Sequence, residues 1–135
     1  ISGNPMTVYG GGNHSTGIMC LSDAIKFLSY MRGLKLKKGQ YKVLNANPYS
    51  FKIKKLAILT RNQLDKFGIK SEISYKYDPR HEKKGLKIIN LAECKTLKKN
   101  IAVTPVEKEI YQTIKLIIKF KKNINSDVLN PSHKW

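Results

Sequence analysis

The stretch NPMTVYGGGNHSTG, residues 4–17, places three consecutive glycines directly after a short run of residues that favour β-structure. The alternation in residues 6–9 predicts a strand that ends where the glycines begin. Glycine adopts backbone angles that other residues avoid, so the triple glycine predicts an unusual turn. Such a turn can face a ligand, or it can serve purely steric needs of the chain. Both interpretations are open at this point.

The residues that follow predict alternating helices and strands. A helix is expected to start with Ser22 as its N-cap and to end at Gly33, and its apolar positions cover most of its circumference, which is typical of a buried helix. Residues 41–44 (YKVL) predict a second strand. Ser50 is expected to cap the next helix, which ends near Gly68.

The second half of the chain continues this pattern. Residues 71–77 (SEISYKY) alternate cleanly between apolar and polar residues and predict a strand, and a short helix is expected around residues 91–97. The capping-box sequence TPVE, residues 104–107, predicts a helix over about residues 105–122. The sequence therefore predicts one α/β unit over residues 1–135, with short strands and about four helices.

The charge of the chain is strongly positive. Lysine and arginine total 26 against 9 acidic residues, which gives a net charge of +17. This excess indicates an anionic partner such as a nucleic acid. Only three of the 26 are arginines, the residue type that best makes bidentate phosphate and base contacts, which weakens the case for specific recognition. A lysine-rich proteome is the alternative explanation.

Sequence patterns of common catalytic and metal sites are missing. There is no Walker loop and no Gly-x-Gly-x-x-Gly turn, and the three histidines are scattered, so we assign no catalytic residue and no metal ligand. Cys20 and Cys94 are too far apart in sequence for a Cys-x-x-Cys site, which favours reduced thiols in a cytoplasmic protein. The most apolar stretch, residues 110–120, is shorter than the ~20 residues of a membrane span, so no membrane partner is expected.

Two side chains are candidates for ligand contact on the residues alone. Arg80 follows the predicted strand at residues 71–77, in a loop where a guanidinium could grip a phosphate. A solvated surface arginine is an equal alternative. Tyr9, beside the glycines, could stack on a planar ring or fill the core.

Several short motifs together resemble a known family. GNPMTVYGGG (residues 3–12) resembles a signature in the C-terminal part of extended short-chain dehydrogenase/reductases, the NAD-dependent nucleotide-sugar epimerases and dehydratases. GQYKVLN (39–45) and FKIKKLA (51–57) are similar to the strand and helix that follow it. DPR (78–80) and PSHKW (131–135) look closest to the UDP-sulfoquinovose synthase family, which uses NAD and sulfite to convert UDP-glucose into a sulfonated UDP-sugar.

This resemblance implies a Rossmann-like enzyme of which the chain is the substrate-binding C-terminal part, with a UDP-sugar as its ligand. The substrate-binding residues that it implies are Val8, Tyr9, Gly12, His14 and Arg80, with Arg80 on the diphosphate. NAD and the catalytic Tyr-x-x-x-Lys pair would belong to an N-terminal domain absent from this chain, which is then not catalytic alone. A homodimer is implied for the full-length family.

Two substitutions depart from the family motif Gly-x-Gln-Thr-Arg-Gly. His14 stands in place of the glutamine, and Thr16 stands in place of the arginine, a second diphosphate contact. Losing a charge-assisted contact of this kind removes roughly 1.5–3 kcal/mol of binding free energy. A degenerate, non-catalytic paralogue and a basic module that binds nucleic acid non-specifically are therefore the alternative functions.

Overall fold

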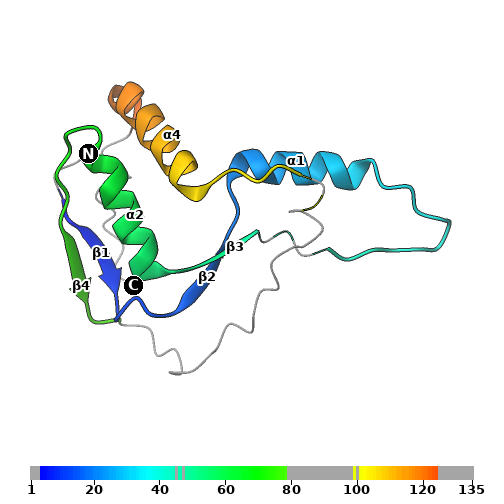
Figure 1. The fold of residues 1–135 in the computed structure, drawn as a ribbon, viewed down its shortest axis with the longest axis horizontal. Helices are drawn as coiled ribbons and strands as arrows, with labels where there is room; N and C mark the ends of the chain where they lie inside the picture. The colour runs from blue at the N-terminus through cyan, green and yellow to red at the C-terminus, as the bar shows by residue number, and fades with distance from the viewer. Residues whose placement is uncertain (1–3, 45, 47, 79–98, 100, 125–135) are drawn as a thin grey trace.

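The computed structural model describes residues 4–44, 46, 48–78, 99 and 101–124 (Figure 1). In chain order, the elements are β1 (Met6–Tyr9), β2 (Ser15–Ile18), α1 (Leu21–Arg32), β3 (Tyr49–Lys52), α2 (Ile53–Asp65), β4 (Ile73–Lys76), α4 (Val106–Lys119) and the 3-10 turn η1 (Lys121–Asn123). The predicted α/β class is confirmed. The described residues contain three α-helices, against about four predicted, and the short helix expected around residues 91–97 lies outside them.

The strands form two separate pairs. β1 and β4 run parallel, from Met6 opposite Ile73 to Tyr9 opposite Lys76. A parallel pair needs a crossover connection. The connection between β1 and β4 contains α2, which packs on both strands. The second pair, β2 and β3, is antiparallel. The predicted strands at residues 6–9 and 71–77 are thus confirmed, the second in a shorter form.

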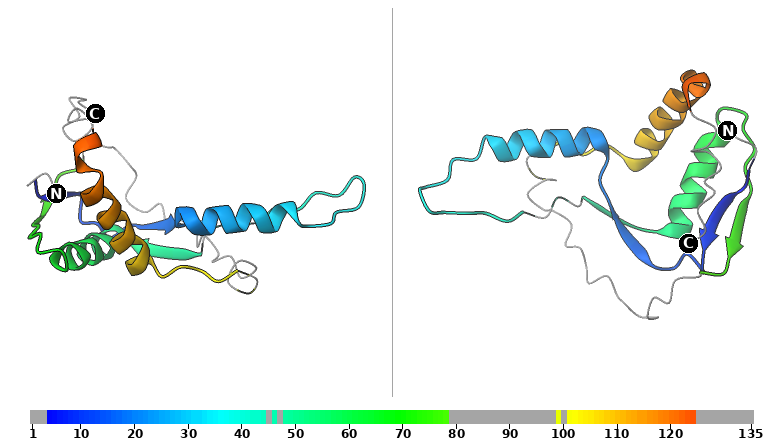
Figure 2. Two further views of the ribbon diagram at one scale, coloured as in Figure 1. Left: turned by 90° about the horizontal axis from the view of Figure 1, so that it is seen from above. Right: turned by 180° about the vertical axis from the view of Figure 1, so that it is seen from behind.

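A helical layer covers the parallel pair. α4 packs against α2, on the side of α2 away from the strands (Figures 1 and 2). Leu64 of α2 and Ile114 of α4 are both buried, and the ring of Phe67, just after α2, stacks on Tyr111 of α4 with 4.8 Å between centroids. No helix among the described residues is both long and apolar enough to cross a bilayer.

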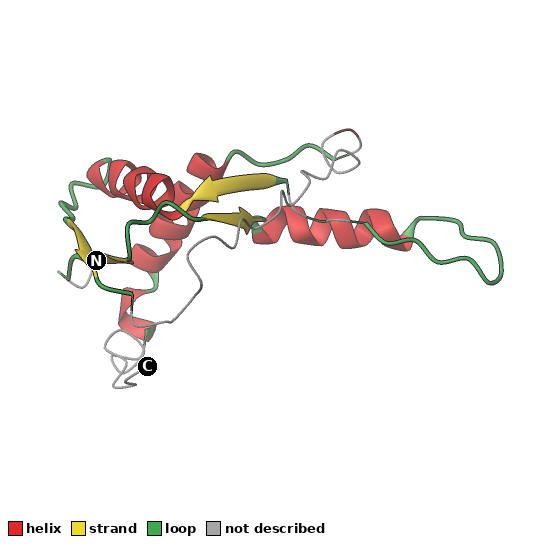
Figure 3. Cartoon of the chain, turned by 90° about the horizontal axis from the view of Figure 1, so that it is seen from below, coloured by secondary structure: helices red, strands yellow, loops and turns green. Residues whose placement is uncertain are grey.

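Helix α1 projects from the rest of the molecule together with the loop that follows it (Figures 1 and 3). Its inner face is held by a small cluster in which Phe27 packs with Ile101. On its outer face, Leu21, Ile25 and Leu28 have 73%, 58% and 65% of their surface exposed. The prediction of a buried helix is therefore wrong for this outer face, although its end at Gly33 is confirmed.

The strand predicted at residues 41–44 is also wrong. These residues have no regular structure and lie in the projecting loop, where Tyr41 and Val43 are more than 80% exposed. A strand needs a neighbour to accept its hydrogen bonds, and among the described residues none lies beside this segment. The strand of this region is instead β3, which contains Ser50, the predicted cap of α2.

The other two predicted N-caps are wrong for a different reason. No side-chain cap bond forms at α1 or α4, which begin after Cys20 and Pro105. The Ser22 hydroxyl donates to Glu109 Oε2 at 3.5 Å, and the Thr104 hydroxyl donates to Asp23 Oδ1 at 2.8 Å. Both hydroxyl groups therefore bond to residues that are distant in sequence and do not cap the helices.

Candidate functional site

The carboxyl ends of the parallel strands meet at one edge of the molecule. We call this the carboxyl edge and define it as residues 9–14, which start with the last residue of β1, and residues 77–78, after β4. The Gly10 N–H donates to the carbonyl oxygen of Lys76 at 2.8 Å, which joins the two segments. Open α/β sheets bind ligands outside the carboxyl ends of their strands. The carboxyl edge is therefore the candidate site.

Residues 10–14, which we call the glycine loop, lie against the start of α2. The backbone N–H of Lys54 donates to the Gly12 carbonyl at 2.9 Å, and that of Ile53 donates to the His14 carbonyl at 3.2 Å. The loop thus satisfies two N–H groups that a helix N-terminus leaves without intrahelical partners. Gly12 has φ +61°, and a methyl group on it would lie 2.9 Å from Val8 Cγ1 and 3.0 Å from the Lys54 nitrogen. The steric role of Gly12 is therefore visible in the structure.

This packing determines how an anion could be held at the carboxyl edge. Loop carbonyls occupy the N–H groups of Ile53 and Lys54, so fewer backbone donors remain at this helix start for an anion, and charged side chains become more important. The first turn of α2 has no acidic residue and carries the exposed side chains of Lys54 and Lys55. Their ammonium groups lie 6.0 Å from the Tyr75 ring centroid and 5.3 Å from that of Phe51. The helix start is thus electropositive.

Four of the five predicted substrate-binding residues lie on this loop or next to it. Val8 is buried, so only its backbone can meet a ligand, whereas Tyr9 is 42% exposed at the end of β1. Gly12 is buried against α2, and His14 is exposed. Arg80 lies outside the described residues, two positions beyond the end of the carboxyl edge. Ligand contact by these five residues stays a prediction.

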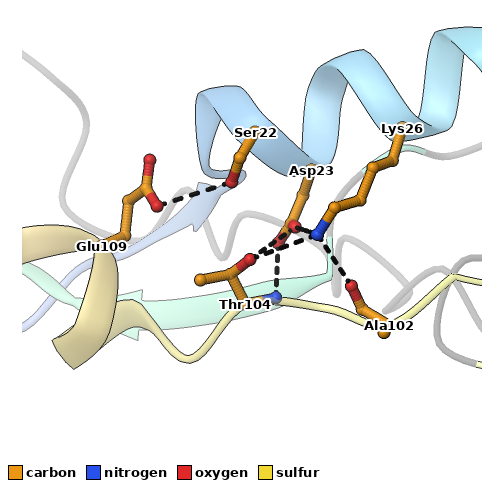
Figure 4. Close-up of polar contacts among 6 residues, drawn as sticks. All are labelled: Ser22, Asp23, Lys26, Ala102, Thr104 and Glu109. Atoms are coloured by element: carbon orange, nitrogen blue, oxygen red, sulfur yellow. Dashed lines mark hydrogen bonds and ion pairs between the residues drawn. The ribbon is translucent and has the colours of Figure 1, made fainter. Parts of the chain in front are cut away.

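A polar cluster around Asp23, in the part of the chain that the structure describes, was not predicted from the sequence. Asp23, on the inner face of α1, has no exposed surface and accepts two hydrogen bonds of 2.8 Å from Thr104, one from the backbone N–H and one from the hydroxyl group (Figure 4). Lys26 Nζ lies 3.0 Å from Asp23 Oδ1 and also donates to the Ala102 carbonyl at 3.2 Å. The cluster joins α1 to the segment that leads into α4.

The cluster shifts two pKa values in opposite directions. Burial alone would raise the pKa of Asp23, but the hydrogen bonds from Thr104 and Lys26 outweigh it and hold this pKa below its ordinary value. The pKa of the neighbouring Cys20 thiol is raised, mainly by burial and further by the charges of Glu109 and Asp23. Cys20 is therefore an inert, protonated thiol, whereas Asp23 is ionised at neutral pH.

The lowered pKa of Asp23 predicts how stability depends on pH. Because the folded-state pKa lies below the unfolded value of about 3.9, the carboxylate stabilises the fold above pH ~4. This stabilisation is lost as the pH falls through the folded-state pKa. We expect urea midpoints measured from pH 6 down to pH 2.5 to fall more steeply in the unmodified protein than in Asp23→Asn. Parallel curves for the two proteins would contradict the assignment.

A Tyr-x-x-x-Lys sequence, the spacing that the resemblance implies for the catalytic pair, occurs once in this chain, at Tyr111 and Lys115 in α4. Packing accounts for this tyrosine, because its ring stacks on Phe67 where α4 meets the end of α2. Phe67 also lines a cavity of about 630 Å³ with Pro5 and Glu72, which precede β1 and β4. Both features lie toward the amino ends of the strands, opposite the carboxyl edge.

Comparison with known proteins gives one informative match, and no protein-family model matches the chain. The chain is 33% identical over 82 residues to a UDP-sulfoquinovose synthase of Sulfolobus acidocaldarius. The match covers 61% of this chain and 21% of that protein, so the chain spans about a fifth of the length of its relative. The similarity supports a relationship between this part of the chain and the nucleotide-sugar enzymes of the extended short-chain dehydrogenase/reductase type.

Proposed function

We propose that this chain is the nucleotide-sugar-binding part of an NAD-dependent enzyme of the UDP-sulfoquinovose synthase type, and that UDP-glucose is its ligand. The observation that carries the proposal is the similarity to the Sulfolobus acidocaldarius synthase. The carboxyl edge supports it, since this edge lies beside the electropositive start of α2. NAD would be bound by a nucleotide-binding part outside this chain, which would also supply the catalytic groups.

The roles of the residues follow from their positions. The diphosphate would lie near Lys54, at the start of α2. Arg80, which follows β4 in the sequence, would bind it through its guanidinium group, as the resemblance to the family implies. Tyr9, at the end of β1, would line the uridine region, together with the backbone of Val8 and the glycine loop. The family motif has an arginine that contacts the diphosphate where this chain has Thr16. Lysine is a point charge without the planar, two-pronged donor geometry of arginine, so Lys54 would replace only part of that contact.

Arg80→Ala is expected to weaken UDP-glucose binding at least tenfold, which is about 1.4 kcal/mol, because a charged contact to the diphosphate is lost. The test uses a chimera in which this chain replaces the matching stretch of the Sulfolobus acidocaldarius synthase, with NAD present. Isothermal titration calorimetry gives the affinity for UDP-glucose. Arg61→Ala, which removes the same charge from the exposed face of α2, is the matched control and should leave the affinity unchanged.

An equal affinity in the Arg80→Ala chimera would remove Arg80 from the site, and no binding by the parent chimera would contradict the proposed function. The alternative function predicts a different result. A basic nucleic-acid-binding module would bind DNA of any sequence, with an affinity that falls steeply with salt because counterions are released, and it would not respond to UDP-glucose.

A further inference from the structure

A cavity of about 630 Å³ lies at the end of the molecule opposite the carboxyl edge. The ends of α2 and α4 meet the starts of β1 and β4 there (Figure 1). We call it the amino-end cavity, and its lining includes Pro5, Phe67, Ile69, Lys70, Glu72 and Ile118. Cavities that hold small organic ligands typically measure about 300–1,000 Å³, so the amino-end cavity has the size of such a site.

Backbone hydrogen bonds fix the wall of the cavity that runs from α2 to β4. Gly68, with φ +69°, ends the helical turn in the left-handed region, and the Ile69 N–H turns back to donate to the Leu64 carbonyl at 3.2 Å. Where this wall reaches the strands, the Met6 N–H donates to the Glu72 carbonyl at 2.8 Å. Both ends of the wall are therefore held by the fold, without the help of a ligand.

The lining combines an apolar wall with charged side chains. Phe67, Ile69 and Ile118 form the apolar part, and Ile118 keeps 39% of its surface exposed although it is apolar. The side chains of Lys70 and Glu72 are exposed. In the part of the chain that the structure describes, neither of these two side chains forms an ion pair or a hydrogen bond. An ammonium group beside an apolar wall is therefore available to a ligand.

The charges of the lining indicate what kind of ligand fits. Lys70 and Lys121 bring two ammonium groups to the cavity, and Glu72 brings one carboxylate, so the lining is positive by one charge. A cation would meet two like charges, and a ligand with several acidic groups would meet Glu72. A ligand with one acidic group neutralises the lining, and an apolar body lets it bury surface against the apolar wall.

We propose that the amino-end cavity is a second ligand site of this chain, for a small organic anion that carries one acidic group on an apolar body. The acidic group binds the Lys70 ammonium, and the apolar body packs on Phe67, Ile69 and Ile118. This inference does not depend on the proposed function, because the cavity and the carboxyl edge lie at opposite ends of the parallel strands.

The probe for this site is 8-anilinonaphthalene-1-sulfonate, a dye with one sulfonate on an apolar ring system, titrated into the chain of residues 1–135 and followed by fluorescence. We expect saturable binding and a higher melting temperature in circular dichroism, because a ligand of the folded state stabilises it. The dye N-phenyl-1-naphthylamine has the same rings without the sulfonate. It should bind about threefold or more weakly, because it cannot pair with the exposed Lys70.

Two pairs of variants locate the bound dye. Ile118→Glu adds a carboxylate to the apolar wall and should weaken binding of the sulfonate dye about tenfold or more. Leu116→Glu makes the same change two positions earlier in α4, at a 56% exposed side chain outside the described lining, and should leave the affinity unchanged. Lys70→Gln should weaken binding about threefold, whereas Lys66→Gln, also exposed and outside that lining, should not.

The inference is overturned if the sulfonate dye does not bind, if it binds without raising the melting temperature, or if the neutral dye binds equally well. Equal losses of affinity in Ile118→Glu and Leu116→Glu would also overturn it, because the dye would then lie elsewhere on the chain. If circular dichroism shows that Ile118→Glu does not fold, the comparison of Lys70→Gln with Lys66→Gln decides, and equal affinities in that pair overturn the inference.

Discussion

Asp23→Ala is expected to lower the free energy of unfolding by about 3 kcal/mol, since hydrogen bonds to charged groups contribute roughly 1.5–3 kcal/mol each. The carboxylate accepts two 2.8 Å bonds from Thr104 in a place with no exposed surface. Without it, the Thr104 N–H loses its partner in a half-buried position. Lys26 contributes less to the loss, because 46% of its side chain is exposed and water can solvate the freed ammonium group.

Urea denaturation followed by far-ultraviolet circular dichroism measures this change as a shift of the midpoint at constant slope. Asp65→Ala removes a carboxylate from an exposed position at the end of α2 and is the control, with an expected change below about 0.5 kcal/mol. The loss in free energy of unfolding for Asp23→Asn should lie between the losses for Asp23→Ala and Asp65→Ala, because the amide keeps the size of the carboxylate and one acceptor oxygen. A loss below 1 kcal/mol for Asp23→Ala would show that the cluster does not anchor α1.

The Asp23 cluster also shows where prediction from sequence stops. Asp23 and Thr104 are separated by 81 positions, and nothing in the local pattern of either residue indicates the other. Local rules predicted that the Ser22 and Thr104 hydroxyls would cap helices, whereas distant partners bind both. A serine or threonine before a helix marks the helix start well, but its hydroxyl goes to whichever acceptor the tertiary fold supplies.

Strong local patterns were predicted correctly. The predicted strands at residues 6–9 and 71–77 form a parallel pair, and both pack against α2. β2 was missed, since STGI contains a glycine and no clear alternation and becomes a strand only through pairing with β3. Residues 41–44 show the opposite case, in which a good local strand pattern finds no neighbour among the described residues.

The candidate site was predicted in part. The signature at residues 3–12 pointed to the loop after β1, and the structure places that loop at the carboxyl edge beside the start of α2. The sequence could not show that the carbonyls of Gly12 and His14 would cap α2, because this depends on the distance between residues that are 42 and 39 positions apart in the chain. The glycines therefore have a structural task whether or not a ligand binds.

Gly12→Ala is expected to lower the free energy of unfolding by about 3 kcal/mol, from two separate costs. A φ of +61° costs an L-residue roughly 1–2 kcal/mol, and a methyl group forced into a packed site typically costs 1–3 kcal/mol more. The methyl group would lie 3.0 Å from the backbone nitrogen of Lys54, which cannot move without breaking its 2.9 Å bond to the Gly12 carbonyl. The substitution should therefore loosen the loop from α2 and destabilise the fold.

Gly39→Ala separates these two costs, because Gly39 also has a positive φ, +80°, but a methyl group there would meet nothing within 4 Å. It should cost only the backbone term, about 1 kcal/mol. The difference between the two urea midpoints therefore measures the close approach of the loop to α2. If the two substitutions cost the same, the loop can move away from the helix easily, and the Gly12 contact does not fix the carboxyl edge. If Gly12→Ala costs more and also lowers the affinity of the chimera for UDP-glucose, the geometry that caps α2 is the one that shapes the ligand site.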